Sequence, residues 1–171
     1  MTELIVRENM ASGRRSFATY SPCERYRYAL TRIWDDSAPK LLFIMLNPST
    51  ATELKNDPTI ERCERRARAL GYGAFRACNL FAFRATDPRD LKRARDPVGP
   101  DNLAELLLAS RWSDTILCAW GTHGAHIGLG PAIRTLLTRE GHQLHHLGLS
   151  KDGHPRHPLY VSYDTPLELW N

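Results

Sequence analysis

The feature that most constrains the fold is an unbroken apolar run over residues 41–46, Leu-Leu-Phe-Ile-Met-Leu, which is followed at once by Asn47-Pro48. Six apolar residues without alternation are typical of a strand that is buried on both faces. Such strands are usually central and parallel, because helices must cover both faces of their sheet. The run therefore predicts an α/β fold.

Helical and strand-like segments alternate after this run. Asp57-Pro58 predicts the start of a helix, with Asp as the N-cap and Pro at the first helical position, and Asp87-Pro88 repeats the signal. We expect further strands over residues 75–83, 115–120 and 142–147, and further helices over residues 100–112 and up to residue 139. This order predicts a three-layer sandwich with a mostly parallel central sheet.

The beginning of the chain follows another pattern. Residues 14–20 and 26–34 are rich in aromatic and β-branched residues and flank a turn at Ser21-Pro22. They predict an N-terminal antiparallel hairpin. Residues 25–28 alternate charge and ring, as expected of an edge strand with one wet face. We expect residues 1–13 to be irregular.

The composition favours one globular domain over residues 1–171. The chain is too short for two domains of ordinary size, and its 42% hydrophobic content is that of a globular protein. No apolar run is long enough to span a membrane, and the first residues do not resemble a secretory signal. We therefore expect a cytoplasmic protein without a membrane partner; its oligomeric state stays open.

The sequence gives no indication of a cofactor. It contains neither GxGxxG nor GxxxxGK[ST], so dinucleotide and P-loop nucleotide binding are unsupported. The four cysteines form no CxxC pair, and the histidines between residues 142 and 157 form no HExxH motif. We predict no metal site and no cofactor.

The net charge of +4 permits a polyanionic partner. The basic helix that begins at Asp57-Pro58 is largely neutralised by glutamates four residues before its arginines. Lys92 and Arg93 are less balanced by acidic neighbours, and they are candidates for phosphate contacts.

Three polar loops follow predicted strands, over residues 47–50, 120–123 and 148–158. Parallel sheets bind ligands beyond the carboxyl ends of their strands. Asn47 can orient a water or read a polar edge, although Asn-Pro also occurs simply as a turn. His154-Pro155 and His157-Pro158 hold two imidazoles on a stiffened loop, where they could take part in proton transfer. The alternative interpretation is that this segment is simply an ordered surface loop.

Several motifs together resemble the DUF1643 family, a domain of unknown function. They are residues 43–51, 57–60, 79–88, 118–121 and 148–160. A weaker resemblance is to the uracil-DNA glycosylase superfamily. Leu46-Asn47-Pro48 is similar to its first motif, Asn79 to its base-reading Asn, residues 117–121 to a strand ending in Trp-Gly, and residues 154–159 to its His-Pro-Ser-Pro-Leu motif.

This second resemblance implies a uracil-DNA glycosylase-like fold and a protein that recognises a base in DNA, with hydrolysis of the N-glycosidic bond of a damaged or modified base as its activity. Asn47 would position the attacking water, and His154 would stabilise the departing base. The residues expected to bind substrate are Phe43, Pro48, Ser49, Thr50, Asn79, Phe81, Trp120, Gly121 and His157, with Phe83 as a further ring that could stack on the base.

The nucleic acid would be held by a second set of residues: Lys151, Pro155, Arg156, Pro158 and Leu159, together with Lys92 and Arg93. Residues 155–159 would fill the gap left by a flipped base as a wedge, with Leu159 as the apolar tip. Two alternatives stay open. One is a non-catalytic module that binds a nucleotide or nucleic acid, and the other is a small-molecule hydrolase that uses His154 or His157 with Ser150 and Asp152.

Overall fold

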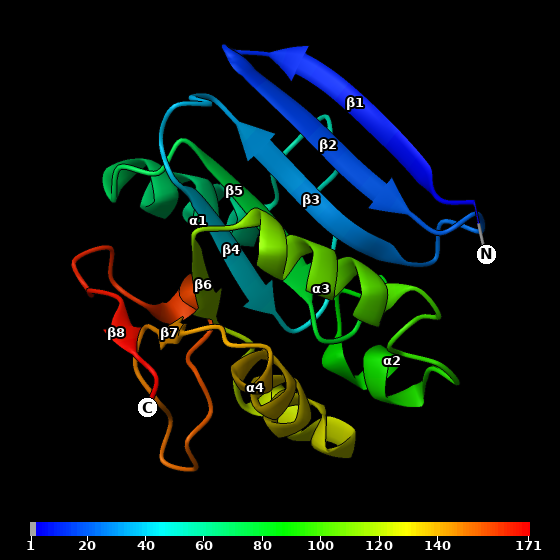
Figure 1. Cartoon of the computed structure of the whole chain (residues 1–171). Coiled ribbons are helices and arrows are strands. Elements are labelled where there is room, and N and C mark those ends of the chain that lie inside the picture. The colour runs from blue at the N-terminus through cyan, green and yellow to red at the C-terminus, as the bar shows by residue number, and fades with distance from the viewer. Residues whose placement is uncertain (1–2) are drawn as a thin grey trace.

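The computed structural model describes residues 3–171 and arranges them around one eight-stranded sheet with the strand order β1-β2-β3-β5-β4-β6-β7-β8 (Figure 1). The strands are β1 (Ile5–Ala11), β2 (Arg14–Tyr20), β3 (Arg27–Ile33), β4 (Lys40–Met45), β5 (Ala74–Asn79), β6 (Thr115–Cys118), β7 (Leu144–His146) and β8 (Glu168–Leu169). The helices are α1 (Pro58–Ala69), α2 (Pro88–Arg93), α3 (Asn102–Trp112) and α4 (Leu129–Arg139), with the 3-10 segments η1 (Thr122–Gly128) and η2 (Pro158–Tyr160).

Helices cover both faces of the sheet, so the predicted three layers are present (Figure 1). Alternate residues of β4 contribute to two separate groups of buried side chains. Phe43 packs with residues of α1, whereas Ile44 packs with residues of α2, α3 and α4. The apolar run is thus buried on both faces, as its sequence predicts. None of the helices within residues 3–171 has both the length and the apolar character needed to cross a bilayer.

The sheet is mixed, and the prediction of a mostly parallel sheet is not confirmed. β5, β4, β6 and β7 run parallel to one another, and they form the part of the sheet that helices connect. The other four pairings, β1 with β2, β2 with β3, β3 with β5, and β7 with β8, are antiparallel. Tight turns can join only antiparallel neighbours, so the hairpin-forming beginning of the chain adds antiparallel strands to a parallel centre.

The predicted hairpin of β2 and β3 is confirmed, but its surroundings differ from the prediction. The expectation that residues 1–13 are irregular is wrong for Ile5–Ala11, which pair along their whole length with β2; residues 1–2 lie outside the described part. Ser12 and Gly13 both have positive φ, as a two-residue hairpin turn requires. The Ser12-Gly13 dipeptide is the sequence signal that could have predicted this hairpin.

The predicted edge position of residues 25–28 is also wrong for β3. The strand order places β3 between β2 and β5, so it is an interior strand.

The predicted start of α1 is confirmed, and it also holds the loop that follows Asn47. The Oδ1 atom of Asp57 accepts a hydrogen bond from the Ile60 backbone N–H at 2.9 Å, which is the N-cap interaction. Its Oδ2 atom accepts from the Ala51 backbone N–H at 3.1 Å. One carboxylate thus connects the helix to the loop at the end of β4.

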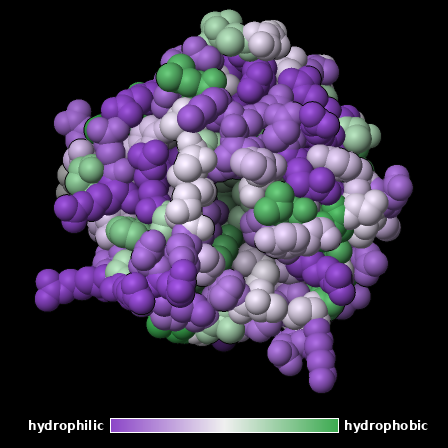
Figure 2. Space-filling model, turned by 180° about the vertical axis from the view of Figure 1, so that it is seen from behind, coloured by the Kyte–Doolittle hydropathy of each residue, from purple (hydrophilic) through white to green (hydrophobic). Residues whose placement is uncertain are grey.

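The surface is hollowed on the side opposite to that shown in Figure 1. A depression opens near the centre of this face, and the residues around it are mostly hydrophilic (Figure 2).

We expect Asp57→Ala to lower the free energy of unfolding by about 2 kcal/mol, because both acceptors are lost. Asp57→Asn should cost less, since its amide oxygen can keep the N-cap interaction with Ile60 and only the bond from Ala51 is lost. Denaturant unfolding measures both changes. Asp87→Ala, at the exposed cap of the short helix α2, is the control and should cost less than either. Equal losses for the Asp57→Ala and Asp87→Ala variants would contradict a double role for Asp57.

Candidate functional site

A cavity of about 700 Å³ lies at the carboxyl ends of β4 and β6. Its walls come from segments far apart in the sequence: the turn after β4, the loop after β6, the segment 85–88 at the start of α2, and residues 150–160. These segments meet because β4 and β6 are parallel neighbours, so the loops that follow them leave the same edge of the sheet.

The cavity brings together a large part of the predicted site. The residues of that set that line it are Asn47, Ser49, Trp120, Gly121, Lys151, His154, Arg156 and His157. The Gly121 backbone N–H donates to the Pro155 carbonyl at 2.8 Å, so the loop after β6 is bonded directly to the double His-Pro segment. The turn at Asn47 and the histidine loop therefore face one another across a common space.

The lining of the cavity is basic. Lys151 and Arg156 contribute permanent positive charge, and His123, His154 and His157 contribute imidazoles. Within residues 3–171, no Asp or Glu belongs to this lining. A concave site with cationic groups and no carboxylate concentrates positive potential, which favours an anionic ligand.

The side chain of Asn47 has a fixed orientation. Its Nδ2 atom donates to the carbonyl oxygens of Ala85 at 2.8 Å and Pro48 at 3.1 Å, with Phe83 at 3.5 Å as a weaker third acceptor. The amide hydrogens are thereby used to hold the loop that leads into α2. The Oδ1 atom is the part of the side chain left for a water or a ligand.

His157 is a neutral imidazole at neutral pH. Its Nδ1 atom accepts a hydrogen bond from the Leu159 backbone N–H at 3.3 Å, so the ring proton is on Nε2. Burial lowers the pKa of His157 to about 4, with the nearby Asp57 carboxylate opposing the shift. His154 instead lies between two cavities, and its backbone N–H donates to the Ser150 Oγ atom at 3.1 Å.

Two arginines of α1 hold the histidine loop in place. The Nε atom of Arg62 donates to the Pro158 carbonyl at 3.1 Å, and Arg66 donates from Nη2 to the Val161 carbonyl at 3.1 Å. The predicted helix pairs Glu61 with Arg65 and Glu64 with Arg68 are also formed. The basic character of α1 is thus divided between ion pairs within the helix and carbonyl contacts that fix the loop carrying His157.

A small extension of about 40 Å³ continues from the cavity beneath Asn47. The two spaces share Asn47, Ser49, Thr59 and His157 in their linings, and the extension adds Pro48 and Asn79 from the predicted set. Asn79, the last residue of β5, is 1% exposed. Its Nδ2 atom has no hydrogen-bond acceptor among residues 3–171.

The two phenylalanines expected to bind substrate lie in the core. Phe43 is fully buried in the group of side chains under α1, and Phe81 is fully buried on the other face, where its ring packs against His126 at a centroid distance of 5.6 Å. Neither lines the cavity, because the side chain of Phe43 on β4 and that of Phe81 just beyond β5 both pack among buried core residues. Phe83 packs edge-on against Tyr26 and does not line the cavity either.

The proposed wedge also differs from its prediction. Leu159 is half-buried, and Pro155 and Pro158 are buried within the loop. The exposed tip is Tyr160, which is 83% exposed and lines the cavity. The backbone bond from Leu159 to the His157 ring turns the leucine inward and presents the next residue to solvent.

Three further predicted residues lie away from the cavity lining. Thr50 is exposed just beyond the Asn47 turn, and Lys92 and Arg93 are exposed in the last turn of α2. Only the first residue of that helix, Pro88, reaches the cavity.

Arg27 and Tyr160 are residues of the site region that sequence reasoning missed. Arg27 is 2% exposed and lines the small extension, although its alternating neighbours suggested a wet edge strand. No local signal distinguishes a buried from an exposed arginine in such a pattern. Tyr160 could have been found as the first aromatic residue after the double His-Pro segment.

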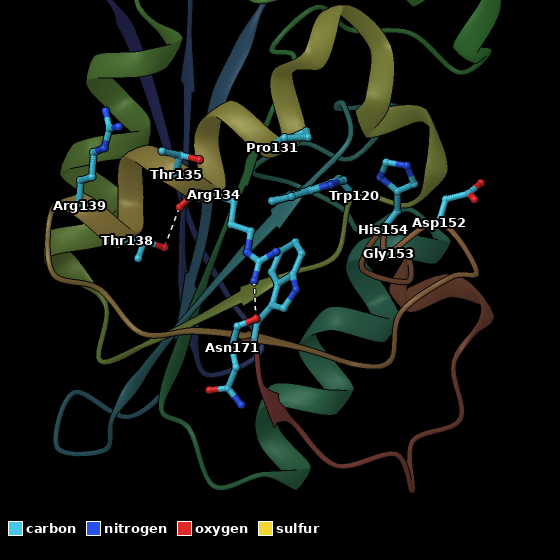
Figure 3. A pocket seen from close by; sticks show the side chains of 11 residues that line it. Trp120, Pro131, Arg134, Thr135, Thr138, Arg139, Asp152, Gly153, His154 and Asn171 are labelled. Carbon is cyan, nitrogen blue, oxygen red and sulfur yellow. Dashed lines mark hydrogen bonds between the residues drawn. The ribbon is translucent and has the colours of Figure 1, made fainter.

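A second cavity of about 610 Å³ lies on the other side of Trp120 and His154, which line both spaces (Figure 3). Arg134 of α4 stacks on the Trp170 ring, 4.0 Å from its centroid, and donates to the Asn171 carbonyl at 2.6 Å. Asp152 lines this second cavity and not the first. The contacts of Arg134 connect α4 to the last residues of the chain.

Comparison with known proteins identifies the family. A family model described as "Protein of unknown function (DUF1643)" matches residues 27–159, which include β3 to β7, all four α-helices and the histidine loop. No curated protein and no solved structure matches the chain, so the resemblance to uracil-DNA glycosylases gains no support from relatives. The match covers most of the sequence, and the chain therefore belongs to the DUF1643 family.

Proposed function

We propose that this protein takes a nucleotide unit of DNA into the 700 Å³ cavity and hydrolyses the bond between its base and its sugar. The observation that carries the proposal is the meeting of the Asn47 turn and the His157 loop around one basic cavity without a carboxylate. A uracil-DNA glycosylase-like arrangement and a cytoplasmic location are part of the same proposal.

The charge of the cavity supports a phosphate-bearing ligand. Lys151 and Arg156 are exposed, so their side chains can reach backbone phosphates outside the cavity. Tyr160 presents an exposed ring next to them, which is suited to stacking on a base. Cationic groups beside an aromatic ring are typical of sites that bind single-stranded or flipped nucleotides.

The proposed reaction needs a water, a cavity and a hydrogen-bond donor to the leaving base. The Asn47 Oδ1 atom accepts a hydrogen bond from a water and directs it at the sugar C1′ atom. The C1′–O bond forms as the C1′–N bond breaks, and the electron pair of the broken bond stays on the base. The proton lost by the water passes to the base or to solvent, and the products are a free base and an abasic sugar.

His157 is a better candidate than His154 for stabilising the departing base. Its Nδ1 atom is already occupied by a backbone N–H, so its Nε2–H is available to donate. A neutral imidazole stabilises developing negative charge by a hydrogen bond and keeps its proton throughout the reaction. The low pKa of His157 preserves this form at neutral pH.

The hydrolase alternative lacks a supporting contact. Ser150 Oγ accepts a hydrogen bond from the His154 backbone and, within residues 3–171, is not paired with a histidine ring. Asp152 does not line the main cavity. The alternative of a non-catalytic binding module uses the same cavity. It predicts binding without release of a base, so a turnover assay distinguishes it from the proposal.

We expect the protein to release bases from oligonucleotides that carry uracil, hypoxanthine or hypermodified bases. Base release leaves abasic sites, and alkali then converts these sites into strand breaks that can be measured. His157→Ala and Asn47→Ala should each lower the single-turnover rate by about 100-fold or more, since each removes one polar contact to the reacting groups. His142→Ala, which changes a histidine outside the cavity, should retain the wild-type rate. Absence of abasic product on single-stranded and duplex substrates alike would refute catalysis and leave only binding.

We expect the affinity for single-stranded DNA to fall steeply with salt, because phosphate contacts release counterions. Lys151→Ala and Arg156→Ala should each weaken binding and reduce the slope of log affinity against log salt by about 0.7. Fluorescence anisotropy measures both quantities. Lys55→Ala, an exposed lysine outside the cavity lining, should keep the wild-type slope. An affinity that does not respond to salt would contradict the phosphate contacts.

We expect acid to destabilise the fold through His157. Its folded pKa of about 4 lies below the ordinary value of 6.5, so the unfolded chain takes up a proton first. The stability contributed by the neutral ring is complete above pH 6.5 and is lost progressively as the pH falls toward 4. Thermal unfolding across this range should therefore show a smaller loss of melting temperature for His157→Asn than for wild type, whereas His142→Asn should follow wild type.

A further inference from the structure

We propose that the second cavity, of about 610 Å³, holds the neighbouring nucleotide unit of a single strand, so that the ligand is a polynucleotide and not a free nucleotide. This inference rests on the proposed function and deepens it by naming the substrate class. The observation that carries it is the position of the second cavity, which meets the 700 Å³ cavity at Trp120 and His154. A strand with one unit in the main cavity can place its next unit in the second.

A short turn over residues 150–154 forms the boundary between the two cavities. Its first two residues line the main cavity, the next two line the second, and His154 lines both. The Ser150 backbone N–H donates to the His154 carbonyl at 2.8 Å, and the Gly153 backbone N–H donates to the Ser150 carbonyl at 2.9 Å. These bonds close the turn tightly, so the two cavities are adjacent, as consecutive units of one strand require.

One face of α4 forms another wall of the second cavity. The residues that share this face recur at intervals of three and four positions, and they are Pro131, Arg134, Thr135, Thr138 and Arg139 (Figure 3). Arginine and threonine side chains are common contacts to the phosphate oxygens of nucleic acids. No acidic residue occurs in α4, so this wall favours an anionic group.

Arg139 and Thr135 are the residues of this face that suit a phosphate. Both are exposed, and they lie four positions apart, one turn along the helix. Within residues 3–171, no carboxylate forms an ion pair with Arg139. The Thr138 hydroxyl, in contrast, donates to the Arg134 carbonyl at 2.8 Å, so its hydrogen is already used within the helix.

Arg134 suits a base better than a phosphate. It stacks on the Trp170 ring, 4.0 Å from the centroid, and donates to the Asn171 carbonyl at 2.6 Å. These two contacts fix the plane of its guanidinium at the wall of the cavity. Unpaired bases stack on arginine planes as well as on aromatic rings, so Arg134 backed by Trp170 is a platform for the second base.

The acidic groups near this wall do not cancel its charge. Asp152 lines the cavity, but it lies on the turn beside His154, at the opposite end from Arg139 (Figure 3). Glu140 follows Arg139 in sequence, yet it lies 4.0 Å from Arg111 and does not line the cavity. The phosphate between the two units is therefore expected at the end of the cavity formed by α4.

Binding of thymidylates of different length tests the inference by calorimetry. We expect the dinucleotide pdTpdT to bind at least about tenfold more tightly than thymidine monophosphate, because it adds a second phosphate and a second base. Arg139→Ala should weaken binding of the dinucleotide by about threefold or more and leave binding of the monophosphate unchanged. Its melting temperature should stay close to that of wild type. Arg95→Ala, which removes an exposed arginine outside both cavities, should change neither affinity.

The outcomes separate the inference from the proposed function. Equal affinity for the two ligands, a dinucleotide affinity that Arg139→Ala does not change, or equal weakening of both ligands by this variant overturns the second site, while nucleotide binding in the main cavity stands. Absence of binding to both ligands overturns the second site and the proposed function together. Tighter binding of the dinucleotide that is reduced in Arg139→Ala and retained in Arg95→Ala supports the second site.

Discussion

The arrangement of the molecule depends on the burial of β4 between β5 and β6, with helices over both of its faces. A strand without a polar face cannot lie at an edge of the sheet, so the chain that leaves it must emerge in the middle of the molecule. Asn47 lies two residues beyond the end of that strand. The cavity exists at this place because the loop after β6 leaves the same edge, one strand away.

Positive charge is used in three ways around this edge. Lys151 and Arg156 remain exposed beside the cavity, Arg62 and Arg66 donate to the carbonyls of the histidine loop, and Arg27 is buried beneath the cavity with one backbone partner. In the proposed function the first group attracts an anionic ligand, whereas the second group fixes the histidine loop to α1. The third is a buried guanidinium whose pKa is lowered by burial to about 10, with the nearby Asp57 carboxylate opposing the shift.

The histidine loop shows how local bonds decide which side chains are available. The Leu159 backbone N–H occupies the Nδ1 atom of His157, which fixes the tautomer of the ring and turns Leu159 inward. Tyr160 consequently becomes the exposed residue at the end of the segment. The two His-Pro pairs indicated a stiff loop, but only these contacts distinguish the buried, neutral His157 from His154 at the border of two cavities.

Local sequence patterns alone determined the buried central strand, the Asp57 cap of α1, the hairpin of β2 and β3, and the polar loops that line the cavity. Each of these follows from periodicity or from capping and turn chemistry, which act over a few residues. The tertiary structure decided that the sheet is mixed, that Phe43 and Phe81 are core residues, and that Arg27 lies under the cavity. Those outcomes depend on which strands become neighbours and on what covers each face. Both are set by the packing of segments distant in the chain, which no local pattern of residues encodes.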